Sequence, residues 1–264
     1  MKIYVCVKQV PDTSGKVAVN PDGTLNRASM QTITNPDDMN ALEAALKIKD
    51  ATGCKVTVVT MGPPPAAGML REALAMGADE AYLVSAREFG GSDTYATSQI
   101  LAAAINKIGV EKDDIVLCGR QAIDGDTAQV GPQISEHLGL PVISYAEGIE
   151  IDGDSVIVKR QFDDRYMMLK AKMPCLITAL SELNEPRYMT PGGIFDAYKK
   201  EITVWGRKDL KDVLDSNLGL KGSPTQIAKA SDKVRKGAGV KETNLDPSAA
   251  ANYIVEKLTE KHVL

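Results

Sequence analysis

Glycine, acidic and hydroxyl residues that could hold a phosphate gather between residues 119 and 130. The apolar run Ile115–Cys118 before them is typical of a buried strand, and the chain has helical character from Thr127 onwards. The polar residues therefore lie at the carboxyl end of a strand and the amino end of a helix, which is where open α/β sheets bind ligands. Free backbone N–H groups at the start of a helix suit a phosphate or pyrophosphate.

Each residue type in this segment has a role in such a site. Gly119 and Gly125 lack a Cβ atom, so they permit positive φ and let a ligand approach the backbone closely. Asp126 is placed to cap the helix, while Thr127 and Gln129 offer polar contacts. A capped surface loop without a ligand would have the same residues, so the segment alone leaves both interpretations open.

The composition of the whole chain excludes several classes of protein. The chain has 264 residues, 44% of them hydrophobic, and a net charge of −4 with both signs mixed along it. It therefore has enough apolar residues for a core and no basic footprint for nucleic acid. A membrane-spanning helix needs a run of about 20 apolar residues, and the sequence has none. The amino terminus has the pattern of a strand rather than a signal peptide. We expect a cytoplasmic protein.

Cysteine and histidine are too scattered for several kinds of site. The four cysteines form no CxxC pair, and three of them lie in strand-like runs, where a free thiol packs as a small hydrophobe. We therefore expect no disulfide, zinc site or iron–sulfur cluster. A histidine triad is not expected either, because the two histidines are far apart in the sequence. The residues concerned are Cys6, Cys54, Cys118, Cys175, His137 and His262.

Strands and helices alternate up to about residue 144. Apolar runs predict strands at residues 3–8, 55–60, 81–84, 115–118 and 141–144, with a helix after each of the first four. This order predicts a doubly wound, mostly parallel α/β sheet with helices on both faces. The loops after the first, second and fourth strands would then meet at one crevice; they contain residues 11–13, 61–62 and 119–127.

The pattern changes after Ile149. Segments 155–161 and 166–171 predict an antiparallel hairpin that extends the sheet, and 174–180 predicts another buried strand. Residues 14–33 predict a short hairpin or loop, and residues 216–246 have the composition of an arm. We assign residues 1–185 to a nucleotide-binding domain and residues 186–264 to a docking loop, an extended arm and a carboxy-terminal helix.

Several segments, taken together, resemble the β subunit of electron transfer flavoproteins. They follow the family's order over about the first three quarters of the chain, and six in register make a chance similarity implausible. The resemblance implies a fold like that of adenine-nucleotide α-hydrolase and universal-stress-type domains. It also implies an obligate heterodimer with an α subunit that carries its own FAD. The segments are residues 5–12, 35–38, 59–63, 73–79, 119–132 and 184–190.

The resemblance further implies where a nucleotide is held. Backbone N–H groups of the glycine-bearing run would take the phosphates, Asp126, Asn35 or Asp38 would bond ribose or adenine, and Cys6 and Val7 would line the adenine pocket. Thr94 is interpreted as part of a helix cap with a secondary ligand contact. The implied residues are Cys6, Val7, Lys8, Asn35, Asp38, Met61, Gly62, Thr94, Gly119, Arg120, Gln121, Ala122, Ile123, Asp124, Gly125, Asp126, Thr127, Ala128, Gln129 and Val130.

The identity of the nucleotide depends on the family branch. Ordinary β subunits hold a structural AMP and tend to carry an acid where Gly125 stands. In electron-bifurcating members the site holds the ADP part of a second FAD, whose ring faces NADH. Residues 9–13 and 125–130 resemble the bifurcating type, and a glycine at position 125 leaves room for a longer pyrophosphate path. We therefore expect FAD with NAD(H) as electron donor, and AMP as the alternative.

The same resemblance implies the electron acceptors. One electron would pass through the α-subunit FAD to an acyl-CoA dehydrogenase and the other to ferredoxin or flavodoxin, so the chain needs no acid–base residue of its own. Segment 185–194 matches the loop that docks the dehydrogenase, although the family's usual leucine near Pro191 is missing. The exposed docking candidates are Glu185, Tyr188, Met189, Ile194 and Phe195, with burial of Tyr188 and Phe195 under the loop as the alternative.

A nucleotide-binding module without redox chemistry is the second class considered. Universal-stress proteins and ATP pyrophosphatases share the implied fold. They usually carry a glycine-rich ATP loop of the GxxG-x9-GS or SGGxDS kind, and neither occurs in this sequence. The colour of the purified complex would separate the two classes, because a flavoprotein is yellow.

Overall fold

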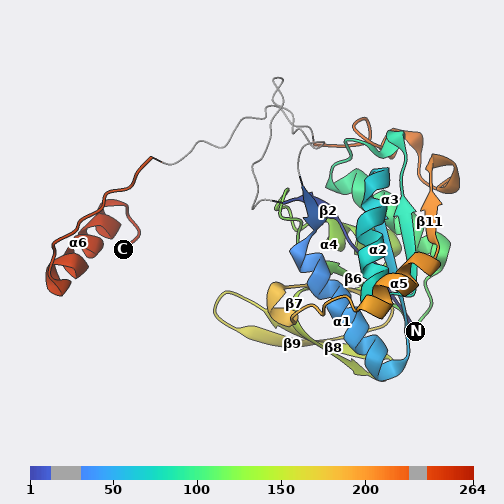
Figure 1. The fold of residues 1–264 in the computed structure, drawn as a ribbon, viewed down its shortest axis with the longest axis horizontal. Helices are drawn as coiled ribbons and strands as arrows, with labels where there is room; N and C mark the ends of the chain where they lie inside the picture. The colour runs from blue at the N-terminus through green and yellow to red at the C-terminus, as the bar shows by residue number, and fades with distance from the viewer. Residues whose placement is uncertain (13–30, 226–236) are drawn as a thin grey trace. The chain divides into compact units, whose positions relative to one another are not determined.

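The core of the protein is a nine-stranded sheet with the strand order β11-β5-β4-β1-β6-β10-β7-β8-β9 (Figure 1). The computed structural model describes residues 1–12, 31–225 and 237–264. A separate two-stranded sheet pairs β2 (Gln9–Pro11) with β3 (Thr32–Thr34). The strands of the large sheet are β1 (Lys2–Cys6), β4 (Lys55–Met61), β5 (Glu80–Val84), β6 (Ile115–Gly119), β7 (Val142–Asp152), β8 (Ser155–Gln161), β9 (Tyr166–Lys172), β10 (Cys175–Ala179) and β11 (Ile202–Trp205).

The order of the strands creates a topological switch point beside β1. This strand pairs in parallel with β4 on one side and with β6 on the other, and β5 lies beyond β4. The chain therefore runs outward from β1 to β5 and then crosses back to β6. Doubly wound sheets bind ligands at the carboxyl ends of the strands where this reversal occurs. The predicted doubly wound, mostly parallel α/β fold is confirmed.

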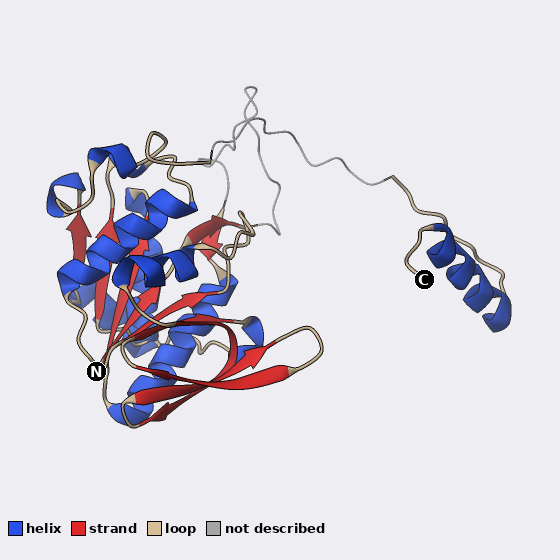
Figure 2. Cartoon of the chain, turned by 180° about the vertical axis from the view of Figure 1, so that it is seen from behind, coloured by secondary structure: helices blue, strands red, loops and turns tan. Residues whose placement is uncertain are grey.

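Helices cover both faces of the sheet (Figure 2). On one face pack α1 (Pro36–Thr52), α2 (Ala67–Met76) and α5 (Pro191–Lys199), and on the other α3 (Thr94–Ile108) and α4 (Val130–Leu138). The last helix, α6 (Pro247–Glu260), belongs to a second unit. Short 3-10 turns occur at Pro64–Ala66, Arg87–Phe89, Ser181–Leu183, Arg207–Asp209 and Asp215–Asn217.

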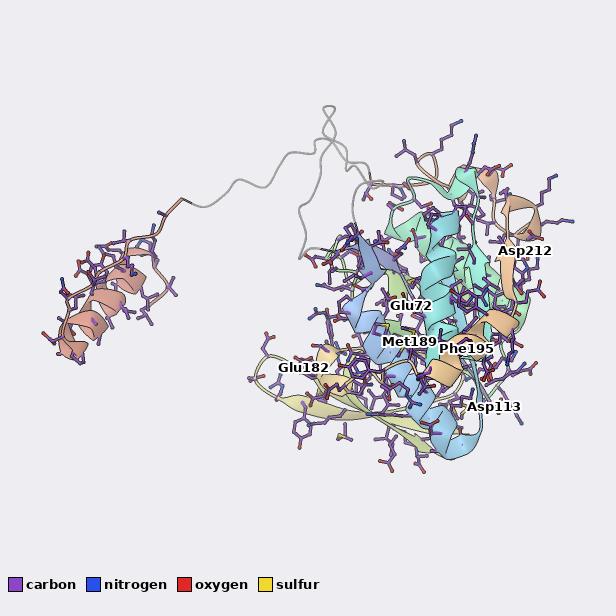
Figure 3. The ribbon with its side chains drawn as sticks, in the orientation of Figure 1. Glu72, Asp113, Glu182, Met189, Phe195 and Asp212 are labelled. Atoms are coloured by element: carbon purple, nitrogen blue, oxygen red, sulfur yellow. The ribbon has the colours of Figure 1, made fainter. Side chains whose placement is uncertain are left out.

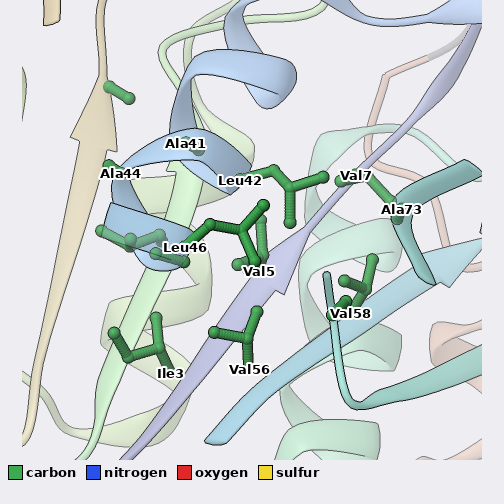
Figure 4. Packing of buried hydrophobic residues seen from close by; sticks show 14 of the residues in the cluster. Ile3, Val5, Val7, Ala41, Leu42, Ala44, Leu46, Val56, Val58 and Ala73 are labelled. Atoms are coloured by element: carbon green, nitrogen blue, oxygen red, sulfur yellow. The ribbon is translucent and has the colours of Figure 1, made fainter. Parts of the chain in front are cut away.

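Burial on both faces explains why β1 is an unbroken apolar run. Ile3 and Val5 face α1 and contact the cluster around Leu42 (Figure 4), whereas Tyr4 and Cys6 belong to the cluster on the opposite face. A strand with helices on both sides has no solvent-facing positions, so alternation of polar and apolar residues disappears. Each such side chain contributes about 1.5–3 kcal/mol through its burial.

The second half of the sheet is partly antiparallel. β8 and β9 form the predicted hairpin, with residues 162–165 at its tip, and β8 pairs antiparallel with β7, which runs on to Asp152 beyond the strand predicted at residues 141–144. β10 then returns into the sheet between β6 and β7 and is parallel to both. The buried strand predicted at residues 174–180 is confirmed, but its insertion between two earlier strands carries no sequence signal.

The described chain separates into two compact units, Met1–Ala228 and Lys229–Leu264. The docking loop, α5 and β11 belong to the first unit, because α5 packs on α2 and β11 pairs with β5. Most of the hairpin or loop expected at residues 14–33 lies outside the described residues, although its flanks β2 and β3 do pair. Within the described ranges, no helix has the length and apolar character needed to cross a bilayer.

Candidate functional site

Asn35 connects the start of α1 to the loop after β6. Its side chain is fully buried, its amide Nδ2 donates to the Gln121 carbonyl at 2.8 Å, and its Oδ1 accepts from Ile123 N at 3.1 Å. Its own backbone N–H donates to the carbonyl of Lys8 at 2.9 Å. The structure thus brings Asn35 and Lys8, which the resemblance assigned to the nucleotide site, together with the loop after β6. Asn35 uses its polar atoms to shape that crevice.

Asp38 clamps the ends of the two central strands. Its Oδ2 accepts from Lys8 N at 2.8 Å, and its Oδ1 accepts from Gly119 N at 2.9 Å. Burial raises the pKa of Asp38 to about 7, while these two backbone N–H groups act in the opposite direction. Both carboxylate oxygens are therefore engaged, and Asp38 holds the frame around the crevice.

Two ion pairs close the crevice at its rim. Lys8 Nζ donates to both oxygens of Asp124, at 2.7 and 3.0 Å, and so joins the end of β1 to the loop after β6. Arg120 Nε lies 3.3 Å from Asp37 Oδ2, without the alignment of a hydrogen bond. Burial raises the pKa of Asp37 and the charge of Arg120 lowers it. Asp37 lies in segment 35–38, which the resemblance to the family assigned to the nucleotide site.

The helix after this loop begins at Val130 instead of Thr127. Its N-cap is Gln129, whose side chain makes no capping hydrogen bond. Asp126 instead accepts a hydrogen bond from Gln121 Nε2 at 2.9 Å. The expectation that Asp126 caps the helix is therefore wrong, and the amino end of α4 has no side-chain cap of its own.

The two glycines of the loop differ in what they permit. A Cβ at Gly119 would lie 2.5 Å from Asp38 Oδ1 and 2.6 Å from the backbone carbonyl carbon of Asp37, so this glycine allows α1 to approach β6. A Cβ at Gly125 would meet nothing within 4 Å. Positive φ occurs instead at Asp126 (49°) and Ala128 (53°). Close approach at Gly119 thus serves protein packing, while the space beside Gly125 is open.

The start of α3 reaches the same loop. Thr94 Oγ1 donates to Gln129 Oε1 at 3.1 Å, and Asp93 caps α3 by accepting from Ala96 N at 3.1 Å. The other oxygen of Asp93 accepts from the backbone and the hydroxyl of Thr225, at 3.0 and 2.7 Å. The predicted cap is confirmed. The contact with Thr225 had no signal in the sequence, because it joins residues 132 positions apart.

The predicted residues on β1 and β4 lie at or just beyond the carboxyl ends of these two neighbouring strands. Cys6 is paired with Cys118 across β1 and β6, both thiols are buried, and burial raises the pKa of Cys6 to about 12. Val7 N donates to Val59 O at 3.0 Å. Met61 and Gly62 are half-buried at the end of β4, the strand next to β1.

This arrangement fits a phosphate or diphosphate group. Residues 124–127 are exposed at the switch point, the space beside Gly125 is open, and the adjoining amino end of α4 carries no side-chain cap. Backbone N–H groups in such a position bind phosphate oxygens, and the helix dipole favours their negative charge. The same features accommodate AMP, whose phosphate is shorter.

The predicted apolar docking residues are exposed, on α5 and in the segment before it, and Figure 3 labels Met189 and Phe195 among them. Tyr188 is 94% exposed and Phe195 74% exposed, so the alternative that they pack under the loop is wrong. Met189 and Ile194 are each 41% exposed, and Glu185 is also exposed. Such a group of apolar side chains on a surface is typical of a protein-binding site.

Comparison with known proteins identifies the family. The family model described as "Electron transfer flavoprotein domain" matches residues 22–210. The chain belongs to the electron transfer flavoprotein family. It is 59% identical to the acryloyl-CoA reductase electron transfer subunit gamma of Anaerotignum propionicum, with all of both chains covered.

Other relatives place the chain among the β subunits of electron transfer flavoproteins. It is 52% identical both to the caffeyl-CoA reductase-Etf complex subunit CarD of Acetobacterium woodii and to the electron transfer flavoprotein subunit beta of Clostridium acetobutylicum. In each case the whole of both chains is covered. The resemblance drawn from the sequence segments is therefore confirmed.

Proposed function

We propose that this β subunit binds FAD in the crevice formed by residues 119–130. With its α partner it would oxidise NADH and divide the electrons between two acceptors. The observation that carries the proposal is the exposed loop beside Gly125, where open space adjoins the uncapped amino end of α4. A diphosphate extends further than the single phosphate of AMP, so it makes use of this space. Bound FAD would supply the hydride and electron chemistry.

The chain's own residues bind and orient the cofactor. Backbone N–H groups at the start of α4 and in the loop would hold the diphosphate. Asn35 and Asp38 keep the loop in place through its backbone, and the pair of Lys8 with Asp124 holds its rim against β1. Asp126 is exposed and accepts a hydrogen bond from Gln121 at Oδ1, and its carboxylate would bond a ribose hydroxyl.

The partners follow from the family and from the exposed surface. We propose an electron transfer flavoprotein α subunit with its own FAD, an acyl-CoA dehydrogenase that docks at Tyr188, Met189 and Ile194, and ferredoxin or flavodoxin as the second acceptor. Two relatives carry acyl-CoA reductases in their names, which supports the second of these partners.

We propose a cytoplasmic location. The four cysteines are free and buried, which fits the reducing cytoplasm.

Cofactor content tests the central claim. Purified heterodimer should contain two FAD molecules and no AMP, and NADH should reduce it and drive the reduction of ferredoxin or flavodoxin. One FAD and one AMP per heterodimer would contradict the proposal and identify a non-bifurcating subunit that docks dehydrogenases.

A matched pair of glycine variants tests the position of the diphosphate. Gly125→Asp adds bulk and charge where the diphosphate would lie, so the second FAD should be lost while the α-subunit FAD remains. Gly68→Asp is the control, because Gly68 is also exposed and has nothing within 4 Å of an added Cβ. Equal flavin content in both variants would place the cofactor elsewhere.

A double variant tests the docking surface. Replacing Met189 and Ile194 with aspartate should abolish electron transfer to the dehydrogenase, because both side chains are partly exposed and a charge there opposes apolar contact. Flavin content and reduction by NADH should not change. Normal dehydrogenase reduction by this variant would count against the docking role.

A further inference from the structure

Arg187 fastens the docking segment to α1. Its backbone N donates to Glu43 Oε2 at 3.1 Å, its Nε donates to the same oxygen at 2.8 Å, and its Nη2 donates to Oε1 at 3.1 Å. The same Nη2 also donates to Asp50 at 2.7 Å. Tyr188, the most exposed apolar side chain of the docking surface, is the next residue in the chain.

The carboxylate that receives Arg187 is built into the protein body. Glu43 is 3% exposed and follows Asp38 in the same helix, about one and a half turns further on. A buried carboxylate without a cationic partner is strongly destabilising, so the geometry of this pair is tightly defined. The planar guanidinium matches a carboxylate through two parallel hydrogen bonds, which a lysine cannot reproduce.

Contacts on either side limit the movement of the rest of the segment. Asn40 Nδ2 donates to the Asn184 carbonyl at 2.6 Å, and Asn184 Nδ2 donates back to the Asn40 carbonyl at 2.9 Å. At the other end, a Cβ on Gly193 would lie 2.3 Å from the Ala75 carbonyl, so α5 packs directly on the backbone of α2. Arg71 also donates to the Lys200 carbonyl at 2.7 Å.

We propose that Arg187, held by Glu43 and Asp50, is a positioning residue that orders Tyr188 and Met189 for docking of the partner dehydrogenase. The inference rests on the docking function proposed above. Because its guanidinium is already paired with two carboxylates, Arg187 does not offer its charge to the partner. Its effect is to remove the conformational freedom that the segment would otherwise lose when the complex forms.

The test is a steady-state assay with the intact heterodimer and the dehydrogenase as varied partner. Glu43→Gln and Arg187→Lys remove part of the bonding, and Arg187→Gln removes the charge. We expect KM for the partner to rise about tenfold in Arg187→Gln and less in Arg187→Lys, since two or three side chains lose their order. Maximal rate, flavin content and reduction by NADH should stay unchanged. Lys199→Gln is the control, because the ion pair that Lys199 makes within the described residues is with exposed Asp196, three positions away.

Hydrogen exchange gives a measurement that does not need the partner. The peptide covering residues 185–190 should exchange faster in Glu43→Gln and Arg187→Lys than in the parent heterodimer, while α1 outside the contact should not change. These two mild variants keep the test decisive if Arg187→Gln fails to fold.

The outcomes separate the two claims. The positioning role is overturned if KM and exchange stay at parent values in Glu43→Gln and Arg187→Lys while Tyr188→Ala raises KM. It is also overturned if flavin content or maximal rate falls in these variants as much as KM rises, because that pattern indicates that the whole protein is destabilised. If Tyr188→Ala and the Met189 and Ile194 double variant leave KM unchanged too, the docking function itself fails.

Discussion

In the site, burial and hydrogen bonding act in opposite directions on the pKa of one carboxyl group, that of Asp38. Asp38 is almost completely buried, and loss of water raises its pKa to about 7, assisted by the negative charge of Asp37. Two backbone N–H groups, from Lys8 and Gly119, favour the ionised form. Since unfolded aspartate has a pKa of about 3.9, the native protein retains a proton at pH values where the unfolded chain has lost it.

This difference predicts a pH-dependent stability. Relative to Asp38→Asn, which does not titrate, the parent protein should lose stability as pH rises from about 4 to about 7, by up to about 4 kcal/mol, and change little above pH 8. Denaturant unfolding of both proteins at several pH values measures the difference between their unfolding free energies. The contributions of the other titratable groups cancel in this difference. A constant difference between pH 5 and 8 would mean that Asp38 is ionised throughout this range in the native state.

The two loop glycines give a second prediction at the same scale. Gly119→Ala should cost about 1–3 kcal/mol of unfolding free energy, because the added methyl group overlaps Asp38 and the α1 backbone. Gly125→Ala should change stability by less than about 0.5 kcal/mol, because the site is open. Thermal or denaturant unfolding compares them. Similar losses in both variants would mean that the loop is packed more closely than its open side indicates.

At the scale of elements, α1 serves both proposed sites. Its first turn holds the loops of the crevice through Asn35 and Asp38, and its middle holds the docking segment through Asn40 and Glu43. The alternation of strands and helices in the sequence predicted a helix after the first strand. It could not identify Glu43, since an acid within a helix is ordinarily interpreted as solvated, and its partner Arg187 lies 144 positions away.

For the other elements too, features set by neighbouring residues in the sequence were predicted, whereas others were not. The alternating strands and helices and the β8–β9 hairpin were predictable, because periodicity and turn residues are local. The start of α4 was misplaced because Asp126 and Ala128 adopt positive φ, which their residue types do not indicate. The strand β11 was missed because it is short. Its last residue, Trp205, contacts Tyr82 of β5, with ring centroids 4.8 Å apart.

At the scale of the molecule, we expect α6, the helix of the second unit, to need contacts outside that unit for its order. α6 has 14 residues and none of them is buried, although Ile254 and Val255 are apolar. Helices of this length are marginal in water without tertiary contacts. Its aspartate cap, Asp246, supplies only about 1 kcal/mol.

Hydrogen exchange should reveal this dependence. In the β chain purified alone, the amides of residues 247–260 should exchange within a few-fold of the rate of an unstructured peptide. In the heterodimer they should be protected, while α1 should be protected in both samples. Strong protection of α6 in the isolated chain would contradict this expectation and mean that its own chain stabilises the helix.

The insertion of β10 between β6 and β7 has a consequence for biosynthesis. Until residues 175–179 leave the ribosome, β6 presents an open edge, and the amide of Arg120 lacks its acceptor, the Ala179 carbonyl. The crevice therefore matures late in translation, after the whole β8–β9 hairpin has emerged. A nascent chain that stalls within this hairpin exposes a strand edge to incorrect pairing with its neighbours on the polysome.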